Sequence, residues 1–456
     1  MNFHRICALL SQLVLLPLSL AGAIAAEPTS QPTTTPPVAA SAAAAGTVAN
    51  PQFRVRPVDD AWRASLPRDA IAATQAYLDR LPPDVVARSN AYFEGGYWLQ
   101  LWGFLLGLAI AAVLLGGRRS ARLRSWCHRI GRKPFFGDAL YGACYTVVAS
   151  VLSFLLTVYQ GFVREHAYGM ATQTFGPWMA EQLTGLAVGT VLGALAVAAL
   201  YAVIRRAGER WWLWGTVLAV ALIALMLVVA PVWIDPLFNT YKPVADGEVK
   251  AAVLTMARAD GVPVANIVEF DASRQTTRVS ANVSGIFGSA SVRLNDNLLR
   301  RTSLPEIRAV MGHELGHYVM NHIYKMVAAF GLLIMAGFLF AQWAMGGLLS
   351  RHGERRGLRG VGDVASLPLF AAVFSTFMFM ATPIANSIVR IQEVEADRFG
   401  LNLSREPQGF AEAALKLTEY RKPDPGAFEE FVLFDHPSTR FRILDAMRWR
   451  EAMGTP

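Results

Sequence analysis

The sequence holds two histidines at a spacing that is typical of metal sites. In the segment MGHELGHYVM, residues 311–320, His313 and His317 are four positions apart and Glu314 directly follows the first. On a helix, residues four apart lie on one face, so both imidazoles can contact one ion. Glu314 can then take the proton of a water that the ion activates. The alternative is a pair of ordinary helical histidines, and the presence of further ligands decides between the two.

A catalytic zinc site takes three protein ligands and leaves one position open for water and substrate. The segment IQEVEADRFG, residues 391–400, offers Glu393 as the third ligand. Asp397 follows one helical turn later and can accept a hydrogen bond from a ligand histidine, which would fix the tautomer of that ring. Glu395 lies off that face, and we expect a structural role for it. The three cysteines form no thiolate pattern, so we expect one Zn2+ ion with histidine and carboxylate ligands.

The elements that must position these residues belong to a membrane protein. Of 456 residues, 53% are hydrophobic and 17% are charged, and the mean hydropathy is +0.33. This composition is too apolar for an ordinary soluble protein. A formal net charge of +8 can indicate nucleic-acid binding, but the basic residues cluster beside long apolar runs, where they set membrane orientation. We therefore expect a lipid bilayer as a partner and no nucleic acid.

Six apolar runs are long enough to cross a bilayer. Interfacial aromatic residues such as Tyr97 and Trp233 lie at their ends, and Pro368 and Pro383 predict kinks in the last run. The runs cover residues 97–116, 139–160, 183–204, 211–234, 326–349 and 366–389. Together with the apolar N-terminus they predict a mainly α-helical, polytopic membrane protein with six to seven transmembrane helices.

The chain divides into four parts. Residues 1–26 have a basic start, an apolar stretch and a small-residue pattern, so they are either a signal peptide or a first transmembrane helix. Residues 27–60 are rich in Pro, Thr and Ala and are expected to be a disordered linker. Residues 61–234 would form an N-terminal membrane domain with four transmembrane helices. Residues 235–456 would form a small α+β metallopeptidase domain, interrupted by the last two runs.

The first soluble stretch of that domain has its own pattern. We expect a helix near residues 246–259, short strands near 266–271 and 291–295, and then the helix that carries HELGH. The sequence SLPE, residues 303–306, is a capping-box pattern and predicts where this helix begins.

Lysine and arginine in the loops predict the orientation in the membrane. Loops 117–138, 205–210 and 350–365 are rich in arginine, whereas loop 161–182 has only Arg164. The positive-inside rule places the three basic loops in the cytoplasm and both soluble stretches on the other side. We therefore expect a bacterial inner-membrane protein with its catalytic domain on the periplasmic side.

Further motifs resemble a known family. HELGH before one spanning run and EVEAD after the next resemble the gluzincin metallopeptidases that include the type 1 CAAX prenyl proteases and the heat-shock membrane proteases. Three segments favour the CAAX protease branch: DPLFNTYKPVADGEVKAAV from Asp235, SANVSGIFGSASVRLNDNLL at 280–299 and DHPSTRFRI at 435–443. The resemblance implies zinc-dependent hydrolysis of peptide bonds in peptide or protein substrates, at a site roofed by the spanning helices.

The resemblance also assigns roles to individual residues. His436 and Arg442 would lie near the developing oxyanion, whose charge both can stabilise by hydrogen bonding. Asp397 would support the ligands. The resemblance implies that the zinc ligands are His313, His317 and Glu393. It also implies that Glu314 is the general base.

A substrate-binding strand is also implied, and here the chain departs from the family. The family strand has an Asn followed by an Ala, whereas this chain, aligned on Gly285, has Ser280 followed by Ala281, with Asn282 one position further on. An extended peptide can pair with the backbone of an edge strand without any particular side chain. A Gly-rich hairpin is the alternative interpretation of this stretch.

Other functions remain open. One is a membrane or envelope quality-control protease of broad specificity, and another is a non-catalytic, metal-stabilised scaffold or a transporter. A transporter has ionisable residues inside its spanning runs, which here are nearly free of charge. A structural zinc site needs a fourth protein ligand, and the nearest spare histidine, His322, is expected off the ligand face. Eukaryotic CAAX proteases face the cytoplasm, opposite to the orientation expected here. We therefore do not expect this chain to share their prenylated substrates.

Overall fold

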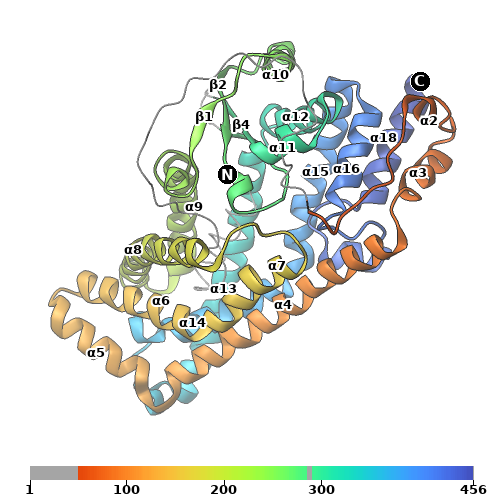
Figure 1. The fold of residues 1–456 in the computed structure, drawn as a ribbon. Coiled ribbons are helices and arrows are strands. Elements are labelled where there is room, and N and C mark those ends of the chain that lie inside the picture. The colour runs from red at the N-terminus through yellow and green to blue at the C-terminus, as the bar shows by residue number, and fades with distance from the viewer. Residues whose placement is uncertain (1–49, 285–289, 455–456) are drawn as a thin grey trace.

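Long helices make up most of the structure, a computed structural model that describes residues 50–284 and 290–454. The long apolar helices lie at one end, and the sheet and shorter helices lie at the other (Figure 1). The expected signal peptide or first transmembrane helix, residues 1–26, lies outside the described residues. Most of the expected linker does so too.

The described end of that linker is packed against the protein. Asn50 is buried, and its Nδ2 donates to the carbonyl oxygen of Tyr168 at 3.0 Å. Phe53 and Val55 contact a core formed by α3, α16 and α18. Residues 50–60 are therefore part of the folded structure, which differs from the expectation of a linker that runs to residue 60.

The membrane part consists of long helices with short ones between them. Its shorter helices are α5 (Arg119–Gly131) and α7 (Arg164–Ala167). The long helices are α4 (Pro83–Leu115), α6 (Pro134–Val158), α8 (Phe175–Ala207), α9 (Trp211–Val229), α13 (His322–Arg356) and α14 (Leu367–Met380). Helices α2 (Asp60–Ala64) and α3 (Ala70–Leu78) precede α4 and lie beside α18 at the other end of the molecule (Figure 1).

Four helical stretches of the described residues are long and apolar enough to cross a membrane, or up to five if one bent pair counts as a span. One stretch, Phe175–Leu237, contains both α8 and α9. These two helices pack against each other, so the chain reverses between them. The reversal uses Gly208, whose φ is 55°, a conformation that glycine adopts at low cost. Each of the six expected runs therefore lies on helical structure.

The bent pair is α14 and α15 (Thr382–Ser404), whose axes differ by 56°. Pro383 lies in the first turn of α15, so the kink expected there is present. Pro368 lies in the first turn of α14, where proline costs no helical hydrogen bond. The last apolar run is thus a broken helix whose second half continues into the EVEAD segment.

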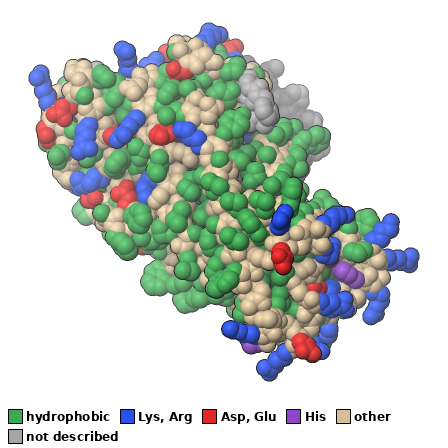
Figure 2. Space-filling model, turned by 180° about the vertical axis from the view of Figure 1, so that it is seen from behind, with side chains coloured by type: hydrophobic (Ala, Val, Ile, Leu, Met, Phe, Trp, Pro, Cys, Tyr) green, Lys and Arg blue, Asp and Glu red, His purple; other side chains and the backbone are tan. Residues whose placement is uncertain are grey.

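Charged side chains gather at the two ends of the molecule, and hydrophobic ones cover the middle of the face in Figure 2. The three basic loops share one end: Arg118 Nε donates to the carbonyl oxygen of Arg355 at 3.1 Å, and Arg205 Nη1 donates to that of Gly362 at 3.4 Å. On the middle band, apolar side chains such as Leu155 are exposed, in this case by 82%. A surface of this kind suits lipid rather than water.

The other end contains, besides α2 and α3, one small sheet and seven further α-helices. The strands are β1 (Tyr241–Pro243), β2 (Val264–Phe270), β3 (Ala281–Ser284) and β4 (Ala290–Asn295), in the order β1-β2-β4-β3. The helices, besides α15, are α10 (Glu248–Ala259), α11 (Asp296–Arg301), α12 (Leu304–Val319), α16 (Pro407–Leu417), α17 (Ala427–Leu433) and α18 (Thr439–Met453). The expected helix and two strands of this stretch correspond to α10, β2 and β4.

Strand β3 lies at the edge of the sheet. It pairs antiparallel with β4, with Ala281 opposite Leu294, and β4 in turn runs parallel to β2. The free edge of β3 faces away from β4, so it is available to an added strand.

Helix α12 lies on this sheet through one apolar face. Ile307, Met311 and Leu315 recur at helical spacing and are buried in one core with Val292 and Leu294 of β4. Burial of such a stripe fixes the rotation of an amphipathic helix. The helix begins at the expected capping box, in which Ser303 N donates to Glu306 Oε2 at 2.6 Å.

Candidate active site

Helices α12 and α15 bring the expected metal ligands together. Both have glycine where they cross: a Cβ on Gly400 would lie 2.6 Å from the backbone nitrogen of His313, and a Cβ on Gly312 would lie 2.8 Å from the carbonyl oxygen of Gly400. These approaches leave no room for a larger residue without a shift of backbone. The close crossing brings HELGH beside Glu393 and Asp397.

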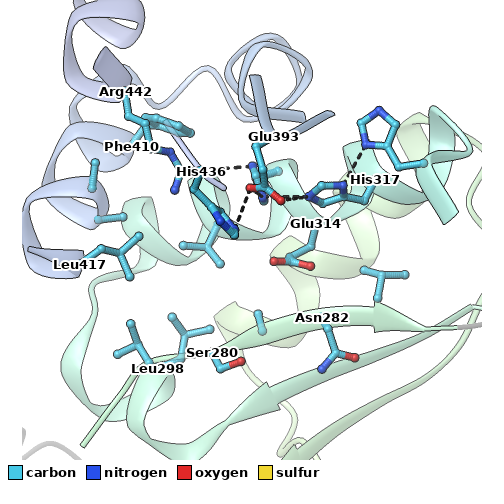
Figure 3. Close-up of a pocket in the computed structure, with 18 of the residues that line it drawn as sticks. Ser280, Asn282, Leu298, Glu314, His317, Glu393, Phe410, Leu417, His436 and Arg442 are labelled. Atoms are coloured by element: carbon cyan, nitrogen blue, oxygen red, sulfur yellow. Dashed lines mark hydrogen bonds and ion pairs between the residues drawn. The ribbon is translucent and has the colours of Figure 1, made fainter. Parts of the chain in front are cut away.

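Three donor atoms form a compact cluster (Figure 3). The Nε2 atoms of His313 and His317 are 3.1 Å apart, and they lie 3.4 Å from Glu393 Oε2 and Oε1, respectively. These residues are the metal-ligand group found among the described residues. Ligand atoms at about 2.1 Å from one zinc ion, at tetrahedral angles, are about 3.4 Å apart. The cluster therefore fits zinc in spacing as well as in donor chemistry.

His313 is held from behind by a buried ion pair, which we name the inner support: Asp397 and Arg442. His313 Nδ1 lies 2.7 Å from Asp397 Oδ1, and Arg442 Nε donates to Asp397 Oδ2 at 2.9 Å. The carboxylate accepts the Nδ1 proton of His313, which leaves the Nε2 lone pair directed at the cluster. Burial lowers the pKa of His313, but its hydrogen bonds to Asp397 and Glu393 and their charges outweigh burial and raise it to about 10.

His317 is held by a different chain of contacts, which we name the outer support: His322, Glu395 and Lys325. His317 Nδ1 lies 2.8 Å from His322 Nδ1, and His322 Nε2 lies 3.1 Å from Glu395 Oε2. Lys325 Nζ donates to the same carboxylate oxygen at 2.9 Å. Because Glu395 accepts the Nε2 proton of His322, His322 Nδ1 can accept the proton of His317 Nδ1. His317 then also presents a lone pair on Nε2.

The position of His322 differs from our expectation that it lies off the ligand face. Helix α12 ends at Val319, and Asn321 has a left-handed conformation with φ of 58°. His322 therefore begins helix α13 instead of continuing α12, and the turn brings its ring against His317. Helical spacing alone gives the wrong direction here because the helix does not continue.

Glu314 points into the space between the cluster and strand β3 (Figure 3). Burial raises the pKa of its carboxyl above the usual range, against the opposing charges of His313 and His317 when those rings are protonated. A carboxylate with a raised pKa is a stronger base than an exposed one. This residue is placed and tuned to accept a proton beside the cluster.

His436 borders the cluster on the other side. Its Nε2 lies 3.3 Å from Glu393 Oε2, and its Nδ1 lies 2.9 Å from Asp435 Oδ1. Burial, followed by the positive charge of Arg421, lowers the pKa of His436 to about 4. The ring is therefore neutral at ordinary pH, with its single proton drawn to Nδ1 by Asp435.

A cavity of about 430 Å³ opens beside these groups. Strand β3 forms one wall, where Ser280 and Asn282 lie across the cavity from Glu314 (Figure 3). Ser280 N donates to Asn295 Oδ1 at 3.0 Å, which holds the start of the strand in place. Ala281 also lines the cavity. Apolar side chains form another part of its wall, including Leu298, Val310, Phe410 and Leu417.

Two family models match adjoining parts of the chain. Peptidase family M48 matches residues 243–450, and the family described as CAAX prenyl protease N-terminal, five membrane helices, matches residues 68–240. The segment that holds HELGH and EVEAD is thus similar to peptidase family M48. Members of this family are zinc metallopeptidases, so the chain is a membrane-embedded metalloprotease that acts on peptide or protein substrates.

Several proteins are similar to this chain over longer stretches. The uncharacterized metalloprotease YhfN of Bacillus subtilis is 28% identical over 84% of this chain and 91% of that protein. The probable CAAX prenyl protease 1 of Schizosaccharomyces pombe is 26% identical over 57% of this chain and 54% of that protein. The crystal structure of Ste24p from S. mikatae superposes with a TM-score of 0.69 and 20% identity, over 82% of this chain and 93% of that chain.

These findings confirm the mainly helical membrane fold and the M48-type enzyme class that the motifs indicated. The structure also brings His313, His317 and Glu393 together, with Glu314 beside them. Arg442 differs from expectation. It lines the cavity, but its guanidinium holds Asp397 behind His313 rather than an oxyanion position.

Two parts of this site were not predicted from the sequence. One is the outer support, whose signal was present as His322 and Glu395 but was obscured by the turn at Asn321. The other is the loop after α16, which brings Tyr420 and Arg421 to the cavity. No motif marks that loop, and only its place in the fold shows that it borders the site.

Proposed function

We propose that this chain is a zinc-dependent endopeptidase in which Glu314 is the general base. The observation that carries the proposal is the cluster of His313, His317 and Glu393, with Glu314 next to it. The two Nε2 atoms are 3.1 Å apart, and each lies 3.4 Å from one of the two oxygens of Glu393. His313, His317 and Glu393 would hold the metal. Bound zinc would supply Lewis-acid chemistry, lowering the pKa of a coordinated water and polarising the scissile carbonyl.

The protein groups would move the proton. Glu314 would take it from the attacking water and pass it to the leaving amine, so no covalent intermediate with the protein is needed. The raised pKa of Glu314 supports both halves of this transfer, because the carboxyl group then holds the proton more firmly between the two steps.

His436 would stabilise the oxyanion only after it gains a second proton. Its neutral form has the proton on Nδ1, facing Asp435, and so has no donor at Nε2. A negative charge developing on the substrate would raise the pKa of the ring and favour the protonated form. Arg442 would act at a distance, by fixing Asp397.

The substrate would lie along β3 as an added strand. This strand is at the edge of the sheet, and residues 279–283 line the cavity opposite Glu314. Backbone hydrogen bonds would then hold the peptide extended across the cluster. The side chains of Ser280, Ala281 and Asn282 would supply contacts but no chemistry.

We also propose that the catalytic end faces the periplasm of a bacterial inner membrane. The three arginine-rich loops lie together at the end opposite the catalytic helices. Under the positive-inside rule that end is cytoplasmic. Prenylated cytoplasmic proteins would then be out of reach, and envelope proteins would be the available substrates.

One experiment tests activity and orientation together. The full chain and Glu314→Gln, purified in lipid nanodiscs with zinc, would be compared for cleavage of casein. Alkaline phosphatase, which is active only outside the cytoplasm, would be fused after Pro456 in cells. We expect cleavage by the parent, loss of cleavage in Glu314→Gln and an active fusion.

Each part has a control. Glu451→Gln changes an exposed glutamate on α18 and should cleave like the parent. Equal cleavage by Glu314→Gln would remove the catalytic role of this residue and leave the scaffold interpretation. An inactive phosphatase fusion would reverse the orientation and return cytoplasmic substrates to consideration.

A further inference from the structure

One cation in the cavity has no anionic partner. Arg421 follows α16 and lines the same cavity as Glu314 and His436. Its side chain makes no hydrogen bond, ion pair or ring contact with any residue in the two described ranges, 50–284 and 290–454. Its positive charge acts on His436, so it lies close enough to influence the centre of the site.

The other cations around this cavity are paired. Lys416 Nζ donates to Glu306 Oε2 at 2.8 Å, and Arg442 is bonded to Asp397. The next residue along the chain, Lys422, contacts Glu94 at 2.7 Å and Glu429 at 2.9 Å. Arg421 therefore stands apart from a local pattern in which every other named basic group has a carboxylate.

An unpaired guanidinium that is partly buried favours an incoming anion. Its planar set of N–H donors matches a carboxylate in two parallel hydrogen bonds, which is stronger and more directional than a contact with lysine. The carboxylates near the site have other partners or positions. Glu393 contacts His313 and His317, and Asp397 contacts Arg442.

The two remaining carboxylates are also placed elsewhere: Asp435 contacts His436, and Glu314 lies beside the metal-ligand cluster. A substrate can bring a further anion to Arg421.

We propose that Arg421 forms a carboxylate-binding subsite of the substrate cavity. The preferred substrates would carry a carboxylate a few residues from the cleaved bond, supplied either by the C-terminus of the peptide or by an Asp or Glu side chain. A C-terminal carboxylate can only be on the part released with the new amine. This inference rests on the proposed peptidase function and specifies its substrate class.

The test begins with a peptide that the protein is known to cut. Cleavage sites in casein would be located by mass spectrometry, and loss of cleavage in Glu314→Gln would establish the activity first. One cut sequence would then be synthesised as a nested series that ends at successive residues after the cleaved bond. Each peptide would be made with a free C-terminal carboxylate and with a C-terminal amide, and longer forms would carry Asp or Asn in the same position.

Arg421→Ala and Arg421→Lys, in nanodiscs with zinc, would be compared with the parent on this series. We expect Arg421→Ala to raise KM for the preferred carboxylate peptide by about tenfold to a hundredfold, the effect of losing one charge-assisted interaction. The value of kcat should not fall, because removing this positive charge makes protonation of His436 easier. Arg421→Lys should recover part of the loss in binding. The amide peptide, or the Asn peptide, should show the same weak binding with parent and variant alike.

The matched control is Arg448→Ala, which removes the same charge from an exposed position on α18 outside the cavity. Arg448→Ala should have the same KM and kcat as the parent on every peptide. The thermal midpoint of Arg421→Ala should equal that of the parent. Sensitivity to amidation would identify the C-terminus as the source, and sensitivity to Asp→Asn would identify a side chain. Equal KM values for parent and Arg421→Ala on all peptides would overturn the proposal, as would a loss confined to kcat. Absence of any cleavage by the parent would instead count against the peptidase function itself.

Discussion

His313 and His317 lie one turn apart on the same helix, yet the groups that hold them differ in charge and in exposure. The inner support of His313 is an ion pair whose side chains are 3% and 10% exposed, Asp397 and Arg442. The outer support of His317 begins with a buried histidine and ends in a pair that is 39% and 49% exposed, Glu395 and Lys325. The contacts that orient His313 thus lie in the protein interior, whereas those that orient His317 extend to the surface.

Because of this difference, we expect the two supports to affect different properties: the stability of the domain and the orientation of one histidine ring. Breaking a buried ion pair leaves a charge without solvent and typically costs about 3–5 kcal/mol, whereas an exposed pair contributes about 0–1 kcal/mol. The inner support should therefore contribute to the stability of the whole domain as well as to the metal site. The outer support should affect the orientation of one ring and little else.

The largest effect is expected from Asp397→Ala. It leaves Arg442 buried without a partner, so the free energy of unfolding should fall by about 3–5 kcal/mol. Zinc affinity should fall by about tenfold to a hundredfold, because His313 loses its orienting contact. Denaturation in detergent and chelator competition measure the two quantities.

The double variant Asp397→Asn with Arg442→Met provides the control. Removing both charges should restore part of the stability that Asp397→Ala loses. Additive losses in the double variant would show that the two residues act separately and that no inner support exists as a unit.

His322→Ala should come next in size. His317 loses the group that fixes its tautomer, and zinc affinity should fall by about tenfold to a hundredfold. Because no charge is left unpaired in the interior, the loss of stability should be smaller than for Asp397→Ala. Chelator competition at fixed pH checks the affinity, and His322→Gln, which keeps a polar side chain, should retain more of it. Unchanged affinity in His322→Ala would remove the outer support from the metal site.

The inner support also predicts a dependence on pH. In the metal-free protein its carboxylate, together with Glu393, raises the pKa of His313 from 6.5 to about 10. Zinc must displace that proton, so zinc affinity should increase by about tenfold per pH unit between pH 6.5 and about 10. A raised folded-state pKa stabilises the metal-free fold below pH 6.5, and this stabilisation should be lost as pH rises towards 10.

Zinc titrations across this pH range, with thermal midpoints of the metal-free protein, test both trends. In Asp397→Asn the affinity should depend less steeply on pH. A slope in the variant equal to that in the parent would mean that the carboxylate of Asp397 does not hold the proton on His313.

The smallest effect is expected from Lys325→Ala. Its ion pair with Glu395 is exposed, so stability should change by no more than about 0.5 kcal/mol. Zinc affinity should change less than in His322→Ala, since Glu395 remains to accept the His322 proton. A loss of affinity as large as that of His322→Ala would show that the outer support is as strongly coupled as the inner one.

Much of this architecture could be predicted because it depends on local patterns. The apolar runs mark helices, and HELGH followed by Glu393 and Asp397 has spacings that only helices can use. The parts that escaped prediction depend on where helices stop. The turn at Asn321 redirects His322, and the position of Arg442 depends on how α18 packs behind α15. Neither choice is encoded by residue spacing along a single helix.

The order of the metal-site residues along the chain would have a further consequence. His313 and Asp397 are 84 positions apart, and α13 and the α14–α15 pair lie between them. One helix leads the chain into the membrane and the broken pair leads it out, so Glu393 returns to the side of His313 only if both insertions succeed. A molecule with either step missing would leave Glu393 in the compartment opposite His313 and His317. Metal binding would then require both insertions, so only correctly inserted molecules could become proteolytic.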